Sequence, residues 1–186
     1  MSKLSIIIGS TRPGRVGLPI GQWFFEQAKR HGKFEVEVVD LKEIGLPLLD
    51  EPKHPRLGEY ENEHTKVWSA RIKASDAFVF VTPEYNYSLA PALLNALDYL
   101  FHEWAYKPAG IVSYGGISGG MRSAQQLKLP LVTLKVMPIP EAVTITFFGQ
   151  LMENGVFKGS EPLQKASVTM LDELVRWAAA LKVLRA

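Results

Sequence analysis

Nine residues near the start of the chain, GSTRPGRVG (Gly9–Gly17), combine the residue types that bind an anion. They follow a short apolar run, Leu4–Ile8, and lead into a segment with helical spacing, Val16–His31. A turn between a strand and a helix leaves free backbone N–H groups at the positive end of the helix dipole, where a phosphate binds well. Side chains able to add hydrogen bonds or charge are those of Ser10, Thr11, Arg12 and Arg15.

Two well-known phosphate loops do not fit this segment. A Walker A loop requires a lysine and a hydroxyl residue after its last glycine, where this chain has Arg15 and Val16. A dinucleotide fingerprint requires a second glycine where this chain has Thr11. We therefore expect phosphate binding by another glycine-bearing loop, and the alternative is a tight turn with two solvated arginines.

A second polar segment, PEYNYS (Pro83–Ser88), follows another apolar run. Tyr85 and Tyr87 can stack on a planar ring, and Asn86 and the backbone can bond the edge of a heterocycle. The alternative is a helix entry capped by Ser88, because asparagine and serine favour turns and caps.

A third segment, GISGG (Gly116–Gly120), formally matches the G-x-S-x-G nucleophile motif of hydrolases, with Ser118 as the nucleophile. The usual chain order requires a histidine after the serine. All four histidines precede it: His31, His54, His64 and His102. Glycines that let a ligand approach the backbone explain the segment better, and a serine hydrolase using Ser118 is kept as an alternative.

Composition narrows the chemistry further. The chain has no cysteine, which excludes disulfides, thiolate catalysis and cysteine-bound metal centres. His102-Glu103 does not extend to a zinc motif, so we expect no metal site and no catalytic side chain. A net charge of +2 does not favour nucleic acid. We see neither a signal peptide nor an apolar run of the roughly 18 residues that span a membrane, so we expect a soluble cytoplasmic protein.

Strands and helices alternate along the chain. The expected strands are Leu4–Ile8, Phe34–Asp40, Ala77–Thr82, Ala109–Tyr114 and Ala142–Thr146. The expected helices are Val16–His31, His64–Ser75, Leu89–Trp104, one from Gly120 that Pro130 kinks or ends, and Pro162–Leu184. This order predicts a five-stranded parallel sheet covered by helices on both faces, in a single domain over residues 1–186. Because parallel strands end at one edge, the three polar segments should meet there.

Together the three segments resemble the NAD(P)H-dependent FMN reductase family. GSTRPGRVG is similar to that family's G-S-x-R phosphate loop, PEYNYS to its P-E-Y-N-x-S segment, and KPAGIVSYGG to its K-P-x-x-x-V-S-Y-G-G stretch. LPLLDEP (Leu46–Pro52), in the long connection from Leu41 to Asn62, is also similar to the family. The resemblance covers most of the chain from Met1 to about Gln126, and it implies a flavodoxin-like fold: a three-layer sandwich that binds FMN.

The resemblance also assigns roles to particular residues. It implies that the FMN phosphate is held by Ser10, Arg12, Arg15, Val16 and Gly17, with Arg15 either replacing a hydroxyl of some relatives or pointing to solvent. It implies that the isoalloxazine ring is lined, mainly through backbone groups, by Pro83, Glu84, Tyr85 and Asn86. It implies that the other side of the ring is flanked by Ser113, Tyr114, Gly115 and Gly116.

The implied activity is that of an FMN-dependent oxidoreductase with NAD(P)H as co-substrate. A reduced nicotinamide would pass a hydride to flavin N5, and the flavin would reduce a small-molecule acceptor such as a quinone, a free flavin, an azo compound or an oxidised metal ion. The resemblance implies a homodimer or homotetramer, and the aromatic cluster Tyr99, Phe101, Trp104 and Tyr106 is a candidate contact. An electron-carrier flavodoxin is the main alternative, although such carriers are typically acidic and this chain is slightly basic.

Overall fold

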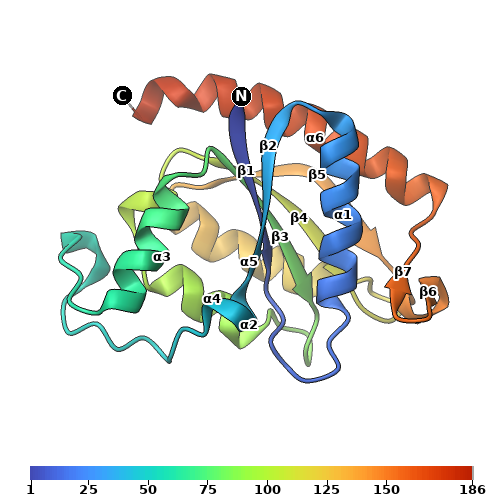
Figure 1. Ribbon diagram of the computed structural model, residues 1–186, viewed down its shortest axis with the longest axis horizontal. Helices are drawn as coiled ribbons and strands as arrows, with labels where there is room; N and C mark the ends of the chain where they lie inside the picture. Colours follow the sequence, from blue (N-terminus) through green and yellow to red (C-terminus); the bar gives the residue numbers. More distant parts are fainter. Residues whose placement is uncertain (186) are drawn as a thin grey trace.

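A five-stranded parallel sheet lies between two layers of helices in the computed structural model, which describes residues 1–185 (Figure 1). The strands stand in the order β2-β1-β3-β4-β5, and every neighbouring pair is parallel. Their bounds are Ser2–Ile8 for β1, Phe34–Asp40 for β2, Ala77–Pro83 for β3, Pro108–Tyr114 for β4 and Met137–Ile145 for β5. The predicted three-layer α/β sandwich is confirmed.

The two central strands explain why the sheet needs cover on both faces. All seven residues of β3 (AFVFVTP) and all seven of β4 (PAGIVSY) are buried. β-Branched and aromatic side chains in such runs pack well on a pleated surface, and a strand buried on both faces shows no alternation with polar residues.

Each face of the sheet has its own helices. On one face lie α1 (Gly17–His31) and α6 (Glu161–Leu181), whose apolar residues pack with Leu4, Ile6, Val79 and Val81 of the strands. On the other face lie α3 (Glu63–Lys73), α4 (Pro91–Asp98) and α5 (Met121–Thr133), packed on Ile7, Phe78, Phe80 and Ile111. Figure 1 shows these two layers on either side of the strands.

The stripe predicted on the first helix is confirmed. Ile20, Trp23, Phe24 and Ala28 of α1 are all buried. Gly21 lies on the same side, and a Cβ built there would stand 2.8 Å from the Ile8 side chain. The missing side chain therefore lets α1 approach the sheet closely.

One predicted helix is shorter than expected. The segment Leu89–Trp104 forms α4 only from Pro91 to Asp98, then a turn and the short 3-10 helix η2 (His102–Trp104). The apolar spacing correctly predicted which side chains are buried, but not that the helix is continuous. Trp104 is fully buried, and its indole N–H donates to the Leu97 carbonyl at 3.3 Å.

Other differences are local. Pro130 does not end α5, which runs on to Thr133. The long connection contains the short helices α2 (Leu41–Ile44) and η1 (Pro55–Leu57). A small hairpin that the sequence did not predict, β6 (Met152–Glu153) with β7 (Val156–Phe157), follows the 3-10 helix η3 (Phe148–Leu151). Among residues 1–185, no helix combines the length and apolarity that crossing a membrane requires.

The three polar segments leave the sheet at one edge, as predicted. They follow β1, β3 and β4, and backbone bonds tie them to neighbouring strands: Gly9 N–H donates to Val81 O at 2.9 Å, and Glu84 N–H to Tyr114 O at 3.2 Å. In Figure 1 these loops lie at the bottom of the molecule, and both chain ends lie at the top.

Candidate functional site

A buried hydroxyl lies at the centre of the loop after β1. Ser10 has no exposed surface, and its Oγ makes no hydrogen bond of full geometry among the described residues, with the Tyr114 hydroxyl beside it. A Cβ built on Gly17 would lie 2.2 Å from Ser10 Oγ and 2.6 Å from the Tyr114 hydroxyl oxygen. Only glycine at position 17 lets these two hydroxyls come together at the start of α1, and an unpaired buried hydroxyl is where a polar ligand group gains most.

Tyr114 reaches this point from the end of β4. Its ring packs edge-on against Phe148, with ring centroids 5.7 Å apart. Burial raises the pKa of Tyr114 above its ordinary value, so the phenol keeps its proton and can donate a hydrogen bond. The structure therefore places the Tyr114 side chain beside the first loop, although its sequence position suggested the third.

Arg15 braces the first loop. Its guanidinium donates to both carboxylate oxygens of Asp40, the last residue of β2, and to the Ser10 carbonyl at 2.6 Å. The two side chains are 7% and 11% exposed, so the expectation that Arg15 points to solvent is wrong. The hydrogen bond from Arg15 to the carboxylate raises the pKa of the guanidinium, although burial opposes this. Asp40 was not singled out from the sequence; its signal is an acid at the carboxyl end of a predicted strand.

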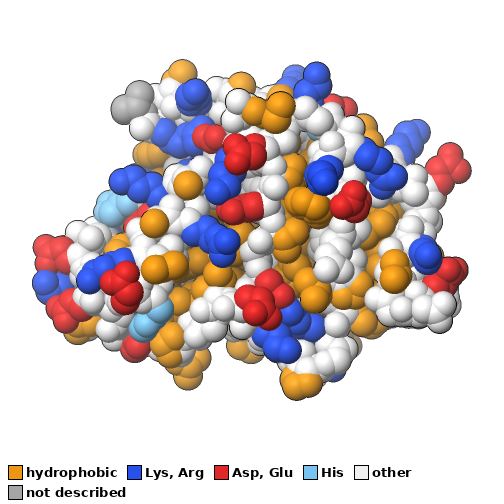
Figure 2. Space-filling view, in the orientation of Figure 1, with side chains coloured by type: hydrophobic (Ala, Val, Ile, Leu, Met, Phe, Trp, Pro, Cys, Tyr) orange, Lys and Arg blue, Asp and Glu red, His pale blue; other side chains and the backbone are white. Residues whose placement is uncertain are grey.

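Arg12 remains available at the loop surface. It is exposed, and its one hydrogen bond in the structure is a long one of 3.4 Å to the Pro13 carbonyl. Figure 2 shows basic side chains at the lower edge of the molecule, over the loop after β1, with acidic side chains directly above them. Arg12 thus offers a positive charge next to the buried Ser10 hydroxyl.

The segment after β3 forms a tight turn. Tyr85 and Ser88 exchange two backbone hydrogen bonds, of 2.9 and 2.8 Å. Asn86 and Tyr87 between them have φ of 49° and 67°. Both central residues of a primed two-residue turn require positive φ, which asparagine tolerates and tyrosine adopts only under constraint. Contacts from outside the turn must therefore hold Tyr87 in this conformation.

The constraint comes from Glu84 and the start of α5. The Glu84 carboxylate accepts hydrogen bonds from Ser118 Oγ at 3.0 Å, from the Arg122 N–H at 3.1 Å and from the Arg122 guanidinium at 2.6 Å. Burial acts to raise the pKa of Glu84, but these donors outweigh it and hold the pKa below its ordinary value. The Glu84 side chain is therefore an ionised anchor directed at α5.

Two residues of α5 hold the turn itself. The Arg122 guanidinium lies over the Tyr87 ring, 3.9 Å from its centroid. Gln126 donates to the Tyr87 carbonyl at 3.1 Å and accepts from Ser88 Oγ at 2.7 Å. These contacts fix the exposed backbone of Asn86 and Tyr87. No local signal in the sequence points to Arg122 or Gln126, because both are ordinary residues of an amphipathic helix.

The third loop is shaped by glycine. Gly119 and Gly120 have φ of 58° and 81°, and a Cβ on Gly120 would lie 2.7 Å from the Tyr114 N atom. Gly115 N–H donates to Ile145 O at 3.2 Å. Gly116 is exposed, with open space where its Cβ would stand. Ser113 and Pro83 are buried in their strands, and Tyr85 is half-buried.

The hydrolase alternative has no support in this geometry. Ser118 Oγ donates to the Glu84 carboxylate and is not bonded to a histidine. The histidines make their contacts elsewhere: His31 with Asp172, His54 with the Arg56 N–H, His64 with Asp50, and His102 with the Arg56 carbonyl. Within residues 1–185, no group of three or more histidine, aspartate or glutamate side chains is placed to hold a metal ion.

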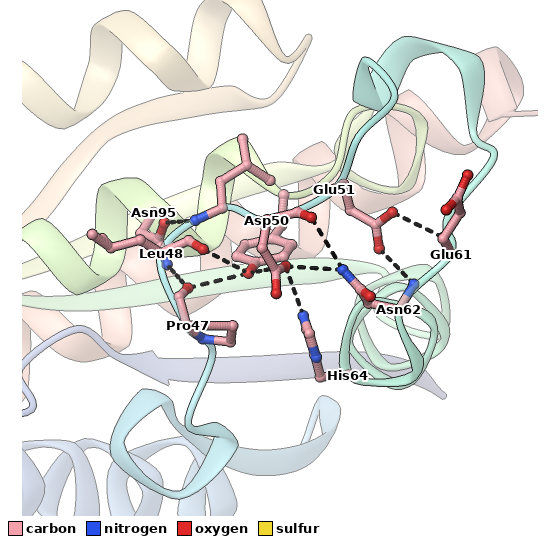
Figure 3. A network of polar contacts seen from close by, with 10 residues as sticks. Pro47, Leu48, Asp50, Glu51, Glu61, Asn62, His64 and Asn95 are labelled. Carbon is pink, nitrogen blue, oxygen red and sulfur yellow. Dashed lines mark hydrogen bonds and ion pairs between the residues drawn. The ribbon is translucent and has the colours of Figure 1, made fainter.

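The long connection after β2 is an ordered strap across α3 and α4 (Figure 3). Asn95 of α4 donates to Pro47 O at 2.7 Å and accepts from Leu49 N–H at 2.9 Å. The Asp50 carboxylate is bonded to His64 of α3 at 3.0 Å and accepts from Tyr99 Oη at 2.9 Å. Burial acts to raise the pKa of Asp50, but these bonds hold it below its ordinary value. In Figure 3 both Asn95 and His64 point at the strap.

Comparison with known proteins adds an independent line of evidence. Residues 2–150 match the family model described as NADPH-dependent FMN reductase. An NAD(P)H-dependent FMN reductase of Schizosaccharomyces pombe is 44% identical over 147 residues, which cover 77% of this chain and 73% of that protein. An FMN-dependent NADPH-azoreductase of Staphylococcus saprophyticus is 27% identical over 176 residues, covering 91% and 92%. The solved structure of FerB, a flavoenzyme NAD(P)H:(acceptor) oxidoreductase from Paracoccus denitrificans, has the same flavodoxin-like fold, with a TM-score of 0.77 at 23% identity over 97% of this chain and 98% of that one.

The Arg15–Asp40 brace predicts strong energetic coupling. Arg15→Met leaves a nearly buried carboxylate without its charge partner and should lower the free energy of unfolding by about 3 kcal/mol. Asp40→Asn should also destabilise, and the double variant should lose at least about 1 kcal/mol less than the sum of the two. Urea unfolding of the four proteins measures this. Lys53→Met in the exposed Lys53–Glu59 pair is the control and should change stability by less than about 1 kcal/mol; additive losses at Arg15 and Asp40 would contradict the brace.

The Glu84–Arg122 contact predicts a pH-dependent effect. The folded-state pKa of Glu84 is depressed, so its contribution to stability is present above the unfolded pKa and is lost as the pH falls through the folded one. Arg122→Met should cost about 1–2 kcal/mol at pH 7 and progressively less as the pH falls from about 4.5, the unfolded value, through the lower folded-state pKa of Glu84. Urea unfolding at pH 7 and at a pH below about 4.5 tests this, with Arg176→Met in the exposed Arg176–Glu173 pair as the control. A loss of stability in Arg122→Met that is the same at the two pH values would refute the assignment.

Proposed function

The chain belongs to the NADPH-dependent FMN reductase family, and from that membership we propose that its FMN binds at the carboxyl edge of the sheet, among the loops after β1, β3 and β4. The protein is an FMN-dependent NAD(P)H oxidoreductase. The site at this edge has two halves, one for the phosphate of the cofactor and one for its ring.

The unpartnered Ser10 hydroxyl carries the proposal. It is fully buried, it lies at the N-terminus of a 15-residue helix, and the protein group beside it is the Tyr114 hydroxyl, with no hydrogen bond of full geometry between the two. A phosphate oxygen would complete it and would also meet the backbone N–H groups at the start of α1. The residues present therefore fit the phosphate of FMN.

The phosphate half of the site consists of Ser10, Arg12, Val16 and Gly17. The Ser10 hydroxyl would donate a hydrogen bond to the phosphate, and Arg12 supplies exposed positive charge. Val16 and Gly17 form the start of α1, where free backbone N–H groups attract an anion. Arg15 serves this half indirectly, because it holds the Ser10 carbonyl and the end of β2 together. Tyr114 adds a protonated hydroxyl beside Gly17, which extends its role beyond flanking the ring.

The ring half of the site is made of backbone from two loops. Pro83, Glu84, Tyr85 and Asn86 offer one wall, and Ser113, Gly115 and Gly116 with the Tyr114 backbone offer the other. The Glu84 side chain is committed to α5, so this residue meets the ring through its main chain. Open space at Gly116 lets a planar ring approach the backbone there.

When bound, FMN would supply the redox chemistry, which is hydride acceptance from the reduced nicotinamide and reduction of the second substrate. The role of the chain is to bind and orient the cofactor. The turn at Asn86 and Tyr87, held by α5, fixes backbone N–H donors, and the exposed glycines leave one face of the site open. The proposed chemistry requires no side-chain acid or base at this edge, because the flavin carries it. This open arrangement suits a small-molecule acceptor, for which we keep quinones, free flavins, azo compounds and oxidised metal ions.

We further propose that the chain forms a homodimer or homotetramer through α4 and α5. Two residues of the aromatic cluster that was a candidate for this contact, Tyr99 and Trp104, are fully buried within one chain and cannot supply it. Exposed apolar residues form a better surface: Leu94 of α4 and, along one side of α5, Met121, Leu129 and Val132. The single-domain organisation, the cytoplasmic location and the lack of a nucleic-acid partner stay predictions from the sequence.

Flavin retention and bleaching test the proposed function. The purified protein, incubated with excess FMN and desalted, should keep the visible flavin spectrum and lose it when NADPH or NADH is added without oxygen. Retained flavin that neither nucleotide bleaches would indicate an electron carrier. Absence of retained flavin, with no quenching of FMN fluorescence in a titration, would contradict the cofactor site.

Two serine variants test where the FMN phosphate binds. Ser10→Ala should raise the dissociation constant of FMN by about tenfold, because a hydrogen bond to a charged group is lost. Ser167→Ala is the matched control, since Ser167 is equally buried but donates to the Leu163 carbonyl within α6. FMN fluorescence titration measures both; equal affinities for the two variants would remove Ser10 from the site.

A charged residue introduced on α5 tests the proposed contact surface between subunits. Leu129 is 72% exposed on α5, and Leu129→Glu should dissociate the oligomer because a carboxylate cannot be buried there without a partner. Val168→Glu on α6, in the opposite helix layer, should leave the assembly intact. Light scattering after size exclusion gives the mass of each; an unchanged mass for Leu129→Glu would refute this surface.

A further inference from the structure

A second cavity lies at the opposite edge of the sheet from the cofactor loops. Its volume is about 850 Å³, within the range of small-molecule sites. Asp76 and Lys107, which line it, directly precede β3 and β4, so the cavity faces the amino ends of the central strands. The end of α3, the helix η2 and the C-terminal 3-10 helix η4 (Lys182–Arg185) complete its walls. Nothing in the proposed reaction uses it.

The acidic groups of this cavity are already satisfied. Glu103 accepts from the Tyr60 hydroxyl at 3.1 Å and from Ser69 Oγ at 2.6 Å. Asp76 accepts from the Lys3 N–H and from the Arg185 guanidinium, each at 2.9 Å. Each carboxylate therefore uses two of its roughly four acceptor sites, and the Asp76 charge is also paired with Arg185.

The basic groups are in excess. Lys107 is only 5% exposed. Its ammonium donates to the Ile72 and Lys73 carbonyls at 2.8 and 3.1 Å and lies 5.6 Å from the centroid of the Phe78 ring, so two of its three N–H groups are used in hydrogen bonds. Lys73 and Lys182 also line the cavity, and within residues 1–185 their ammonium groups make no ion pair or hydrogen bond. With Arg185, four cations stand against two engaged carboxylates, so the cavity attracts an anion.

The remaining walls are apolar or aromatic. Tyr60 and Tyr106 present rings, and Ala105 and Leu184 present aliphatic surface. The Tyr60 hydroxyl is tied to Glu103, which fixes that ring. Such walls favour a ligand whose anionic head is joined to a flat apolar body over a bare inorganic anion.

We propose that this cavity is a second binding site, separate from the flavin, for small aromatic carboxylates, with the carboxylate held by Lys73, Lys107 and Lys182 and the ring lying between Tyr60 and Tyr106. The site stands on its own residues and does not depend on where FMN binds.

The surroundings of Lys107 predict how binding depends on pH. Burial, together with the charges of Arg185 and Lys73, lowers the pKa of Lys107 to about 8, while Asp76 and Glu103 act in the opposite direction. A bound carboxylate stabilises the protonated form, so binding takes up a proton near pH 8. Affinity should therefore be constant below about pH 7 and fall as the pH rises through about 8.

The test uses 2-naphthoate, titrated by calorimetry into the full chain loaded with FMN. We expect saturable binding, much weaker binding of the neutral 2-naphthamide, and an affinity that falls above about pH 8. The double variant Lys73→Gln/Lys182→Gln should bind 2-naphthoate about tenfold more weakly, because two charge contacts are lost. Lys128→Gln/Lys165→Gln, with the same loss of charge on α5 and α6, is the control and should bind as the parent does.

Four results would overturn the site: no heat with 2-naphthoate at millimolar concentration, equal binding of the amide, equal loss of affinity in both double variants, or release of FMN during the titration. The last would place the carboxylate in the flavin site. Because the flavin spectrum is followed in the same samples, failure of this site is distinguished from failure of the proposed function.

Discussion

Parallel pairing of β1, β3 and β4 is the constraint on which the rest of the molecule depends. Strands that run in one direction deliver the segments after them to one edge, and the helices that return the chain must then cover both faces. Three stretches far apart in the chain therefore meet around Ser10, Glu84 and Gly116. The same geometry places the residues before β3 and β4 at the other edge, where the lysine-lined cavity lies.

The carboxyl edge of the sheet separates groups that are bonded within the protein from groups left for a ligand. The Arg15 guanidinium is paired with Asp40, and the Glu84 carboxylate is bonded to Ser118 and Arg122. These charged groups therefore stabilise the loops and are not available to a ligand. What remains unsatisfied is the Ser10 hydroxyl, with the exposed Arg12 beside it. Arg15 and Glu84 are thus positioning residues here, whereas the groups left for a ligand are a hydroxyl, the Arg12 guanidinium, glycines and main chain.

The sequence predicted the layers and the three loops but not their mutual contacts. Apolar runs and turn residues are local signals, so β3, β4 and the stripe of α1 were found from them. Contacts such as Arg15–Asp40 and Glu84–Arg122 join residues 25 and 38 positions apart, and no spacing rule reports them. The helix expected over Leu89–Trp104 shows the complementary error: periodicity recorded that Trp104 is buried but not that the chain turns after Asp98. Arg15, drawn from a resemblance as a phosphate ligand, has a buried partner that only the fold reveals.

A crystal structure of the protein soaked with FMN would decide where the cofactor lies. We expect its phosphate within hydrogen-bond distance of Ser10 Oγ at the start of α1, with the ring between the Pro83–Asn86 and Ser113–Gly116 segments and Arg15 still bound to Asp40. A flavin found at the amino edge of the sheet, or a phosphate held by Arg15 with Asp40 released, would show that the assigned site is wrong.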